Sequence, residues 1–279
     1  MKRSVFFLSL LILGFNLFPQ ESQRAYTLDL RRDITLSVFS AGLFFGQFFL
    51  DDSPKIPANL NRSDVNILDR GLMFDNRALD VSIYALPVLN ALPIIVHLTA
   101  AGWDINNNWD KWLTYGTMYT QTYFLTLGTR GLLKGTIDRY RPRDYFRDTI
   151  DRPIPTNSFP SGSTTIAFMP ATFLSVTFSA EYPDSPWKIP VIVGSYTVAT
   201  AVGVIRILSG AHFLTDVLAG AAIGSFFGWL VPTLHKNTGN DSGAADSRAV
   251  MRGTAYSLSE GFQTSGPFIG NGIIFTFRF

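Results

Sequence analysis

Three short polar segments of this chain carry side chains that could hold a tetrahedral anion. In the most specific one, Arg206, His212 and Asp216 follow the spacing Arg-x5-His-x3-Asp. On a helix, His212 and Asp216 would share one face, so the carboxylate could accept a hydrogen bond from one imidazole nitrogen. The other nitrogen would then be free to act as a nucleophile. Phosphoryl transfer through a phosphohistidine requires an imidazole oriented in this way.

The second segment contains Lys134 and Arg141, which are followed by Pro142. Seven residues are about two helical turns, so both cations could face one side of a helix until the proline interrupts it. Arginine offers phosphate oxygens a forked set of donors, and lysine offers a point charge. Taken alone, a basic cluster beside a span is more typical of a topology signal or a headgroup anchor.

The third segment includes Ser158, Ser161, Gly162 and Ser163, and it precedes an apolar run that starts at Ile166. A small turn that opens a helix leaves backbone N–H groups free at the positive end of the helix dipole, where anions bind. An ordinary helix cap uses the same residue types, so this segment by itself favours the simpler interpretation.

Each of the three segments lies at the end of a long apolar stretch. Six such stretches follow the amino-terminal region and predict six helices, at 34–50, 79–102, 112–133, 164–179, 189–205 and 213–233. A membrane span needs about 20 mostly apolar residues, and the first and fourth stretches are short by this measure. The first could instead be a buried or interfacial helix. The polar connection Asp51–Asp80 is assigned no chemistry.

The composition favours a membrane protein, because 47% of the residues are hydrophobic and only 16% are charged. The formal net charge of +2 is too small to suggest a nucleic-acid surface. The chain has no cysteine, which excludes a disulfide framework, a thiol nucleophile and a cysteine metal site. One bundle of spanning helices fits these properties better than one or two soluble domains.

The chain divides into three parts. Residues 1–22 have a basic start and then a short apolar run, as signal peptides do; the alternative is an uncleaved anchor. Residues 23–235 form the main domain. Residues 236–279 form a tail whose last eight residues partly alternate between apolar and polar, which is typical of a strand. Of the other histidines, His97 is predicted to pack or to hydrogen-bond between helices, and His235 to flank the last helix.

Taken together, the three segments resemble the signature of the type 2 phosphatidic acid phosphatase family: Lys-x6-Arg-Pro, then Pro-Ser-Gly-His, then Arg-x5-His-x3-Asp. The resemblance covers about residues 112–233. It implies an all-α, six-helix membrane bundle of the acid phosphatase and vanadium haloperoxidase type. It also implies metal-independent hydrolysis without a cofactor, and the sequence shows no metal-ligand cluster at these positions.

The resemblance further implies a role for each residue of the site. His212 would attack phosphorus, and Asp216 would orient it. The remaining residues would bind the substrate phosphate through their side chains or backbone: Lys134, Arg141, Ser161, Gly162 and Arg206.

The sequence departs from the family pattern at Ser163, where the family has a histidine that protonates the leaving oxygen. A serine hydroxyl cannot release a proton near neutral pH as a histidine with a pKa of about 6.5 can. General acid catalysis is worth roughly 10²–10⁴-fold, so Ser163 predicts an impaired or specialised catalyst. Three explanations stay open: a substrate with a better leaving group, an enzyme that has degenerated into a binding protein, and an engineered substitution.

The sequence therefore predicts a membrane phosphatase that acts on a lipid phosphate or an isoprenyl diphosphate. The alternative is a non-catalytic membrane protein that binds lipid phosphates. A transporter is disfavoured because the polar residues lie at helix ends rather than near the bilayer midplane. The expected location is a bacterial-type cytoplasmic membrane, crossed several times, with the site on the periplasmic face.

Overall fold

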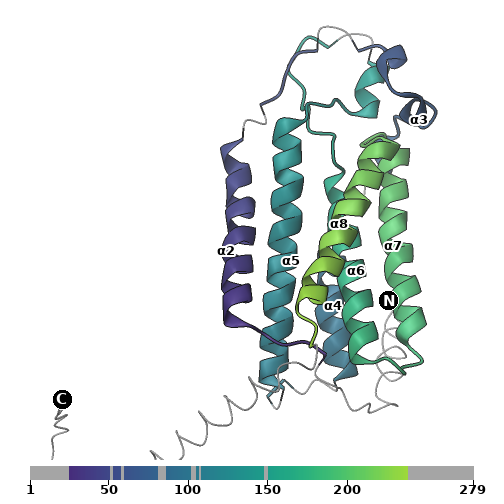
Figure 1. Ribbon diagram of the computed structural model, residues 1–279. Coiled ribbons are helices and arrows are strands. Elements are labelled where there is room, and N and C mark those ends of the chain that lie inside the picture. Colours follow the sequence, from purple (N-terminus) through teal and green to yellow (C-terminus); the bar gives the residue numbers. More distant parts are fainter. Residues whose placement is uncertain are drawn as a thin grey trace, which may run out of the picture. The chain divides into compact units, whose positions relative to one another are not determined.

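The computed structural model describes residues 25–50, 53–57, 60–80, 86–101, 105–106, 108–147 and 150–237. Its long helices run alongside one another within residues 25–236 (Figure 1). They are α2 (Leu30–Gly46), α4 (Leu86–Ala100), α5 (Trp109–Thr136), α6 (Gly162–Glu181), α7 (Lys188–Leu208) and α8 (Leu214–Leu234). A four-residue helix, α3 (Ile67–Arg70), and short 3₁₀ turns lie in the connections.

The helical class predicted from the sequence is confirmed, and each of the six apolar stretches overlaps one long helix. In the described ranges the only β structure consists of isolated bridges, such as the one between Tyr26 and Lys236. The predicted signal peptide and the predicted strand near the carboxyl terminus both lie outside the described residues. Six helices as the count for the whole chain, and the division into three parts, stay predictions.

Helices α6 and α8 form the closest pair in the bundle, and a row of glycines makes their contact possible. A side chain at Gly220, Gly224 or Gly228 would come closer than real Cβ atoms do to a backbone carbonyl of the α6 segment. Small residues at every fourth position let two helix backbones approach and make van der Waals contact. This row therefore fixes the amino-terminal end of α8 against that of α6.

Helices α7 and α8 have the length and composition of membrane spans, at 21 residues each. Large apolar side chains on their outer faces are exposed, among them Ile189, Val193 and Phe226. Such exposure suits helices that face lipid. The helix α4 is apolar too, but it is shorter.

The two remaining histidines lie in the helical part of the chain, outside the predicted site. His97 is buried on α4, and its Nε2 lies 2.8 Å from the Thr177 hydroxyl on α6, an interhelical hydrogen bond of the kind expected. His235 follows the end of α8 as its C-cap, so the prediction that it flanks the last helix is confirmed. It is fully buried, and its Nε2 lies 2.8 Å from the Asp33 carboxylate on α2. The sequence spacing between these two residues gave no sign of this pair.

Candidate active site

The site forms where α5, α7 and two helix starts meet at one end of the bundle. Helices α5 and α7 end there, and α6 and α8 begin there (Figure 1). The three predicted segments are the connections at this end, so segments that are far apart in the chain come together. The connection that contains α3 lies at the same end.

His212 lies in the turn between α7 and α8, so the expectation that it shares a helix face with Asp216 was wrong. Helix α7 ends at Leu208, and α8 begins only at Leu214. Gly210 turns the chain with a φ of 69°, a conformation that glycine adopts without strain. The N–H of His212 donates to the carbonyl oxygen of Arg206 at 3.2 Å, which closes the turn.

The imidazole of His212 is oriented by a backbone carbonyl. Its Nδ1 lies 2.8 Å from the carbonyl oxygen of Ser158, whereas the nearer Asp216 oxygen is 3.7 Å from Nδ1, too far for a hydrogen bond. A carbonyl oxygen only accepts, so Nδ1 carries the hydrogen. The lone pair of the neutral ring is therefore on Nε2, the nitrogen available for attack.

The surroundings of His212 keep its imidazole neutral. Burial lowers the pKa of His212 to about 4; the nearby Asp216 carboxylate opposes this shift, and the positive charges of Arg141, Arg206 and Lys134 add to it. A neutral imidazole is the nucleophilic form. All three cations that are predicted to bind phosphate therefore lower the pKa of the predicted nucleophile.

We expect ¹⁵N-histidine NMR of the protein in micelles to show His212 neutral from pH 7 down to about pH 5, with protonation only near pH 4. Because the folded pKa is below the ordinary 6.5, acid protonates the unfolded chain first, and stability is lost as the pH falls from 6.5 towards 4. His212→Gln identifies the resonance. A titration midpoint near 6.5 would contradict this environment.

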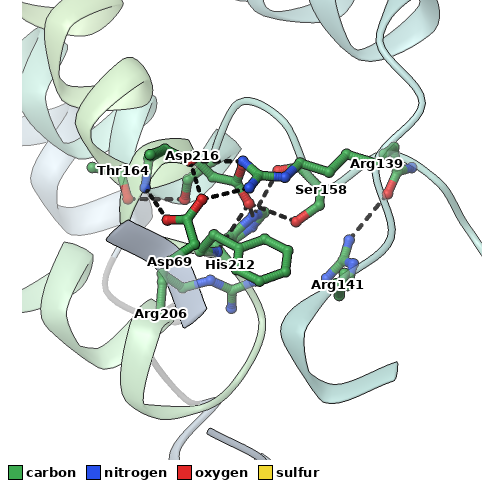
Figure 2. Close-up of polar contacts among 12 residues, drawn as sticks. Asp69, Arg139, Arg141, Ser158, Thr164, Arg206, His212 and Asp216 are labelled. Atoms are coloured by element: carbon green, nitrogen blue, oxygen red, sulfur yellow. Dashed lines mark hydrogen bonds and ion pairs between the residues drawn. The ribbon is translucent and has the colours of Figure 1, made fainter. Parts of the chain in front are cut away.

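Asp216 is the centre of a buried ion-pair network that the sequence did not reveal (Figure 2). Its carboxylate accepts hydrogen bonds from the Ser158 hydroxyl at 2.6 Å, from the Phe213 N–H at 2.9 Å and from Arg139 at 2.5 Å. Ser158 thus joins the two residues, because its hydroxyl binds Asp216 and its carbonyl binds His212. Asp216 therefore acts on His212 both through Ser158 and through its own charge, 3.7 Å from Nδ1.

Arg139 connects this network to the connection before α4. Its guanidinium binds Asp216 and also Asp69 of α3, both at 2.5 Å, and it lies over the Phe213 ring (Figure 2). Asp69 is fully buried and also accepts from the Thr215 N–H and hydroxyl. Burial alone would raise the pKa of Asp69, but the hydrogen bonds from Thr215 and Arg139 lower it. The connection Asp51–Asp80, to which the sequence assigned no chemistry, therefore supplies a carboxylate to the network around the predicted site.

We expect Arg139→Gln to lower both stability and activity, because it leaves Asp69 and Asp216 without their shared cation. Breaking a mostly buried ion pair by removing one partner typically costs about 3–5 kcal/mol. Thermal unfolding in detergent and phosphate release measure the two effects. Arg77→Gln is the matched control, since it removes a half-exposed pair with Asp75 that is worth at most about 1 kcal/mol. Equal effects of the two variants would contradict the proposed network.

Lys134 and Arg141 do not share a helix, contrary to the prediction. Helix α5 ends at Thr136, and the chain is extended at Ile137. The two cations meet at Asn157 instead: Lys134 Nζ donates to its backbone carbonyl, and Arg141 Nη2 donates to its side-chain oxygen at 3.1 Å. Desolvation by burial lowers the pKa of Arg141, and the neighbouring Arg143 and Arg206 add to this effect.

Arg206, the third predicted phosphate ligand, is buried near the end of α7 and already binds a carboxylate. Its Nη1 donates to Asp80, and Arg143 Nη1 lies 3.6 Å from the other oxygen of the same side chain. A carboxylate held between two guanidinium groups occupies the kind of position that a phosphate oxygen could take.

The first turn of α6 supplies the remaining predicted residues. Ser161 is fully buried; its N–H donates to the Asp216 carbonyl at 2.9 Å, and its hydroxyl bonds with that of Thr164. Gly162 opens the helix, and Ser163 follows it, partly exposed. The described residues provide Ser163 with no side-chain hydrogen-bond partner. Phosphate binding by these residues stays a prediction.

In the described part of the chain, no group of three or more His, Asp or Glu side chains has the arrangement of a metal site. The site consists instead of one neutral histidine, a buried carboxylate network and several guanidinium groups at the end of a helical bundle. Such a set of groups has the chemistry that anion binding and phosphoryl transfer require.

A protein-family match agrees with this class. Residues 112–239 match the PAP2 superfamily. A stretch of 74 residues is 42% identical to a lipid A 1-phosphatase of Porphyromonas gingivalis; it covers 26% of this chain and 15% of that protein's length. A transmembrane PAP2-type phosphatidylglycerolphosphate phosphatase from Bacillus subtilis aligns over 72% of this chain and 94% of its own, with 22% identity and a TM-score of 0.40. Residues 112–239, the part of the chain that holds the predicted site, thus match the same family that the three sequence segments resemble.

Proposed function

We propose that this protein is a membrane phosphatase that hydrolyses a lipid phosphate or an isoprenyl diphosphate through a phosphohistidine at His212. The observation that carries the proposal is the state of this imidazole: Nδ1 is bound to the Ser158 carbonyl, so Nε2 keeps its lone pair. The positive charges of Lys134, Arg141 and Arg206 surround it. A neutral nucleophile inside a group of cations suits attack on an anionic phosphorus.

In the proposed reaction, the substrate phosphate replaces Asp80 at Arg206 and binds Arg141 and Lys134. His212 Nε2 then attacks phosphorus, the bond from phosphorus to the leaving oxygen breaks, and its electron pair stays on that oxygen. A lipid alkoxide takes a proton from solvent, whereas a lipid monophosphate released from a diphosphate leaves as the anion. Water cleaves the phosphohistidine, and both of its hydrogens leave with the phosphate as dihydrogen phosphate. The ring returns to the neutral state with its hydrogen still on Nδ1. Asp216 and Ser158 keep the imidazole oriented throughout.

The test is phosphate release by the purified protein in detergent. The substrates are phosphatidate, phosphatidylglycerophosphate, an isoprenyl diphosphate and, because of the similarity to a lipid A 1-phosphatase, lipid A with a 1-phosphate. Release that depends on His212 and continues in the presence of EDTA supports the proposal, including its independence of metal. Release that EDTA abolishes would contradict the metal-free mechanism.

The second candidate function is non-catalytic binding of lipid phosphates, and Ser163 is the observation that favours it. The position that should supply a proton carries a side chain that cannot do so near neutral pH. Tight binding of lipid phosphate without release from any of the four substrates would support this function. Release from even one of them would exclude it.

We further propose that the site faces the periplasm. Arg31, Arg32 and Lys236 lie at the opposite end of the bundle, which suits a cytoplasmic end under the positive-inside bias. If α2, α4 and α5 each cross the membrane, this orientation places the start of α2 in the cytoplasm. A cleaved signal peptide would instead leave the start of α2 on the periplasmic side, so the two proposals exclude each other.

The orientation can be tested directly because the chain has no cysteine. A single cysteine at Asp151, in the connection before α6, should react with a membrane-impermeant maleimide in intact cells. A cysteine at Lys236 should react only after the membrane is opened. The reverse pattern would place the site in the cytoplasm.

A further inference from the structure

Arg130 is a cation beside the site that neither the family pattern nor the proposed reaction uses. It lies on α5 one turn before Lys134, so the two side chains project from the same face of the helix. Its Nε is buried, and no group in the described residues accepts a hydrogen bond from it. A polar atom shielded from solvent without a partner is costly, and ionisable residues inside spanning bundles usually serve a function.

The side chain of Arg130 packs against the start of α6. A Cβ on Gly162 would lie 2.9 Å from Arg130 Nη1, 3.4 Å from its Cδ and 3.7 Å from Lys134 Cε. Gly162 must therefore lack a side chain for the guanidinium to come this close. Arg130 and Lys134 both reach the first turn of α6, where backbone N–H groups have no partner within the helix.

This turn also contains Ser163, the position where the family has its proton donor. A missing proton donor matters most when the leaving group is an alkoxide and least when it is a phosphate, which carries its charge without protonation. A fixed positive charge near the leaving group can stabilise the same developing charge without any proton transfer.

We propose that Arg130 and the first turn of α6 form a second phosphate subsite, which binds the inner phosphate of a lipid diphosphate. The inference rests on the proposed phosphatase function and deepens it, because it selects diphosphates as the substrate class. His212 Nε2 attacks the terminal phosphorus, and the bond to the bridging oxygen breaks. The electron pair stays on that oxygen, which leaves as part of the lipid monophosphate. Arg130 offsets the charge that this product gains.

A headgroup anchor is the other role open to an arginine in a spanning helix. An anchoring side chain extends outward to the interface and keeps its charged end in water. Arg130 instead lies against Gly162, at the contact between α5 and α6, and its Nε is shielded from solvent. This position favours a ligand bound inside the site.

The test compares Arg130→Gln with the wild type on two substrates that share one lipid chain, an isoprenyl diphosphate and the matching monophosphate. One lost hydrogen-bonded charge contact should lower kcat/KM for the diphosphate by roughly 10–100-fold, and the monophosphate value should fall less than about 3-fold. Arg130→Lys should recover part of the diphosphate activity. Arg31→Gln, an exposed arginine on α2, is the control and should change neither value.

Binding and stability measurements separate this inference from the proposed function. Inorganic pyrophosphate should bind Arg130→Gln at least 10-fold more weakly than it binds the wild type, while inorganic phosphate should bind both about equally. This binding comparison can be made even if the wild type releases no phosphate. Such a result would contradict the proposed function but not the second subsite. The melting temperature of Arg130→Gln should not fall, since the charge has no protein partner to lose.

Three results would overturn the second subsite. Equal losses on the two substrates would place Arg130 at the transferred phosphate. A melting temperature lowered in both Arg130→Gln and Arg130→Lys would make the residue structural. Unchanged binding of pyrophosphate would show that the guanidinium does not touch the ligand.

Discussion

His212→Ala should reduce phosphate release to the uncatalysed background, a loss of roughly 10⁴-fold or more, as expected when a nucleophile is removed. The variant should still fold, because the buried carboxylates keep their partners in the Arg139 network. His212→Gln is the control for the cavity that alanine leaves, because glutamine fills a similar volume; it should lose the same activity. Alkaline quenching, which preserves phosphohistidine, should trap labelled phosphoenzyme in the wild type and in neither variant.

The matched comparison for this prediction is Asp216→Asn, which should retain measurable turnover. The carboxylate does not bond to His212; it holds Ser158, whose carbonyl binds the imidazole. Asparagine can still accept from the Ser158 hydroxyl, so the ring should stay partly oriented while the pairing with Arg139 weakens. Unchanged turnover in His212→Ala would exclude the phosphohistidine mechanism whatever Asp216→Asn does.

Ser163→His should raise turnover on a phosphomonoester with a poor alcohol leaving group by roughly 10²-fold or more, the scale of general acid catalysis. Ser163 lies in the first turn of α6, partly exposed and without a side-chain partner in the described residues. A new imidazole therefore displaces no existing hydrogen bond. It can protonate the oxygen that leaves, which an alkoxide needs.

A diphosphate should gain much less from the same substitution, because its leaving group is already a stable anion. The ratio of the two gains in kcat/KM is the quantity to measure, since it reports transition-state stabilisation rather than expression level. Equal gains on both substrates would refute leaving-group specialisation as the reason for the serine. No gain on either substrate, with lipid phosphate still bound, would favour the binding function.

The sequence was informative wherever function fixes residue types at set spacings. Lys134, Arg141, Arg206 and His212 could be identified because each belongs to a motif. The helices followed from long apolar runs, which need no knowledge of their neighbours. The motif spacing nevertheless misled about local geometry, because it suggests a continuous helix where Gly210 turns the chain and where α5 has already ended.

The residues that support the site were not predictable in this way. Asp69 and Arg139 are 70 positions apart, and only the folded bundle brings their side chains together. Arg139 could have been noticed in the basic segment between Lys134 and Arg141, but nothing in the sequence distinguishes its ion pairs from a phosphate contact. Arg130 lies within an apolar stretch, and its relation to Gly162 depends on how α5 packs against α6.

The glycine row between α6 and α8 limits how a lipid can reach the site. Because the two backbones touch at Gly220, Gly224 and Gly228, these helices cannot separate without losing their whole contact. If helices of the bundle separate transiently, we therefore expect this at other helix contacts, such as those of α4 or α7. A lipid tail should enter the site between such helices, while the distance between His212 and the first turn of α6 stays constant.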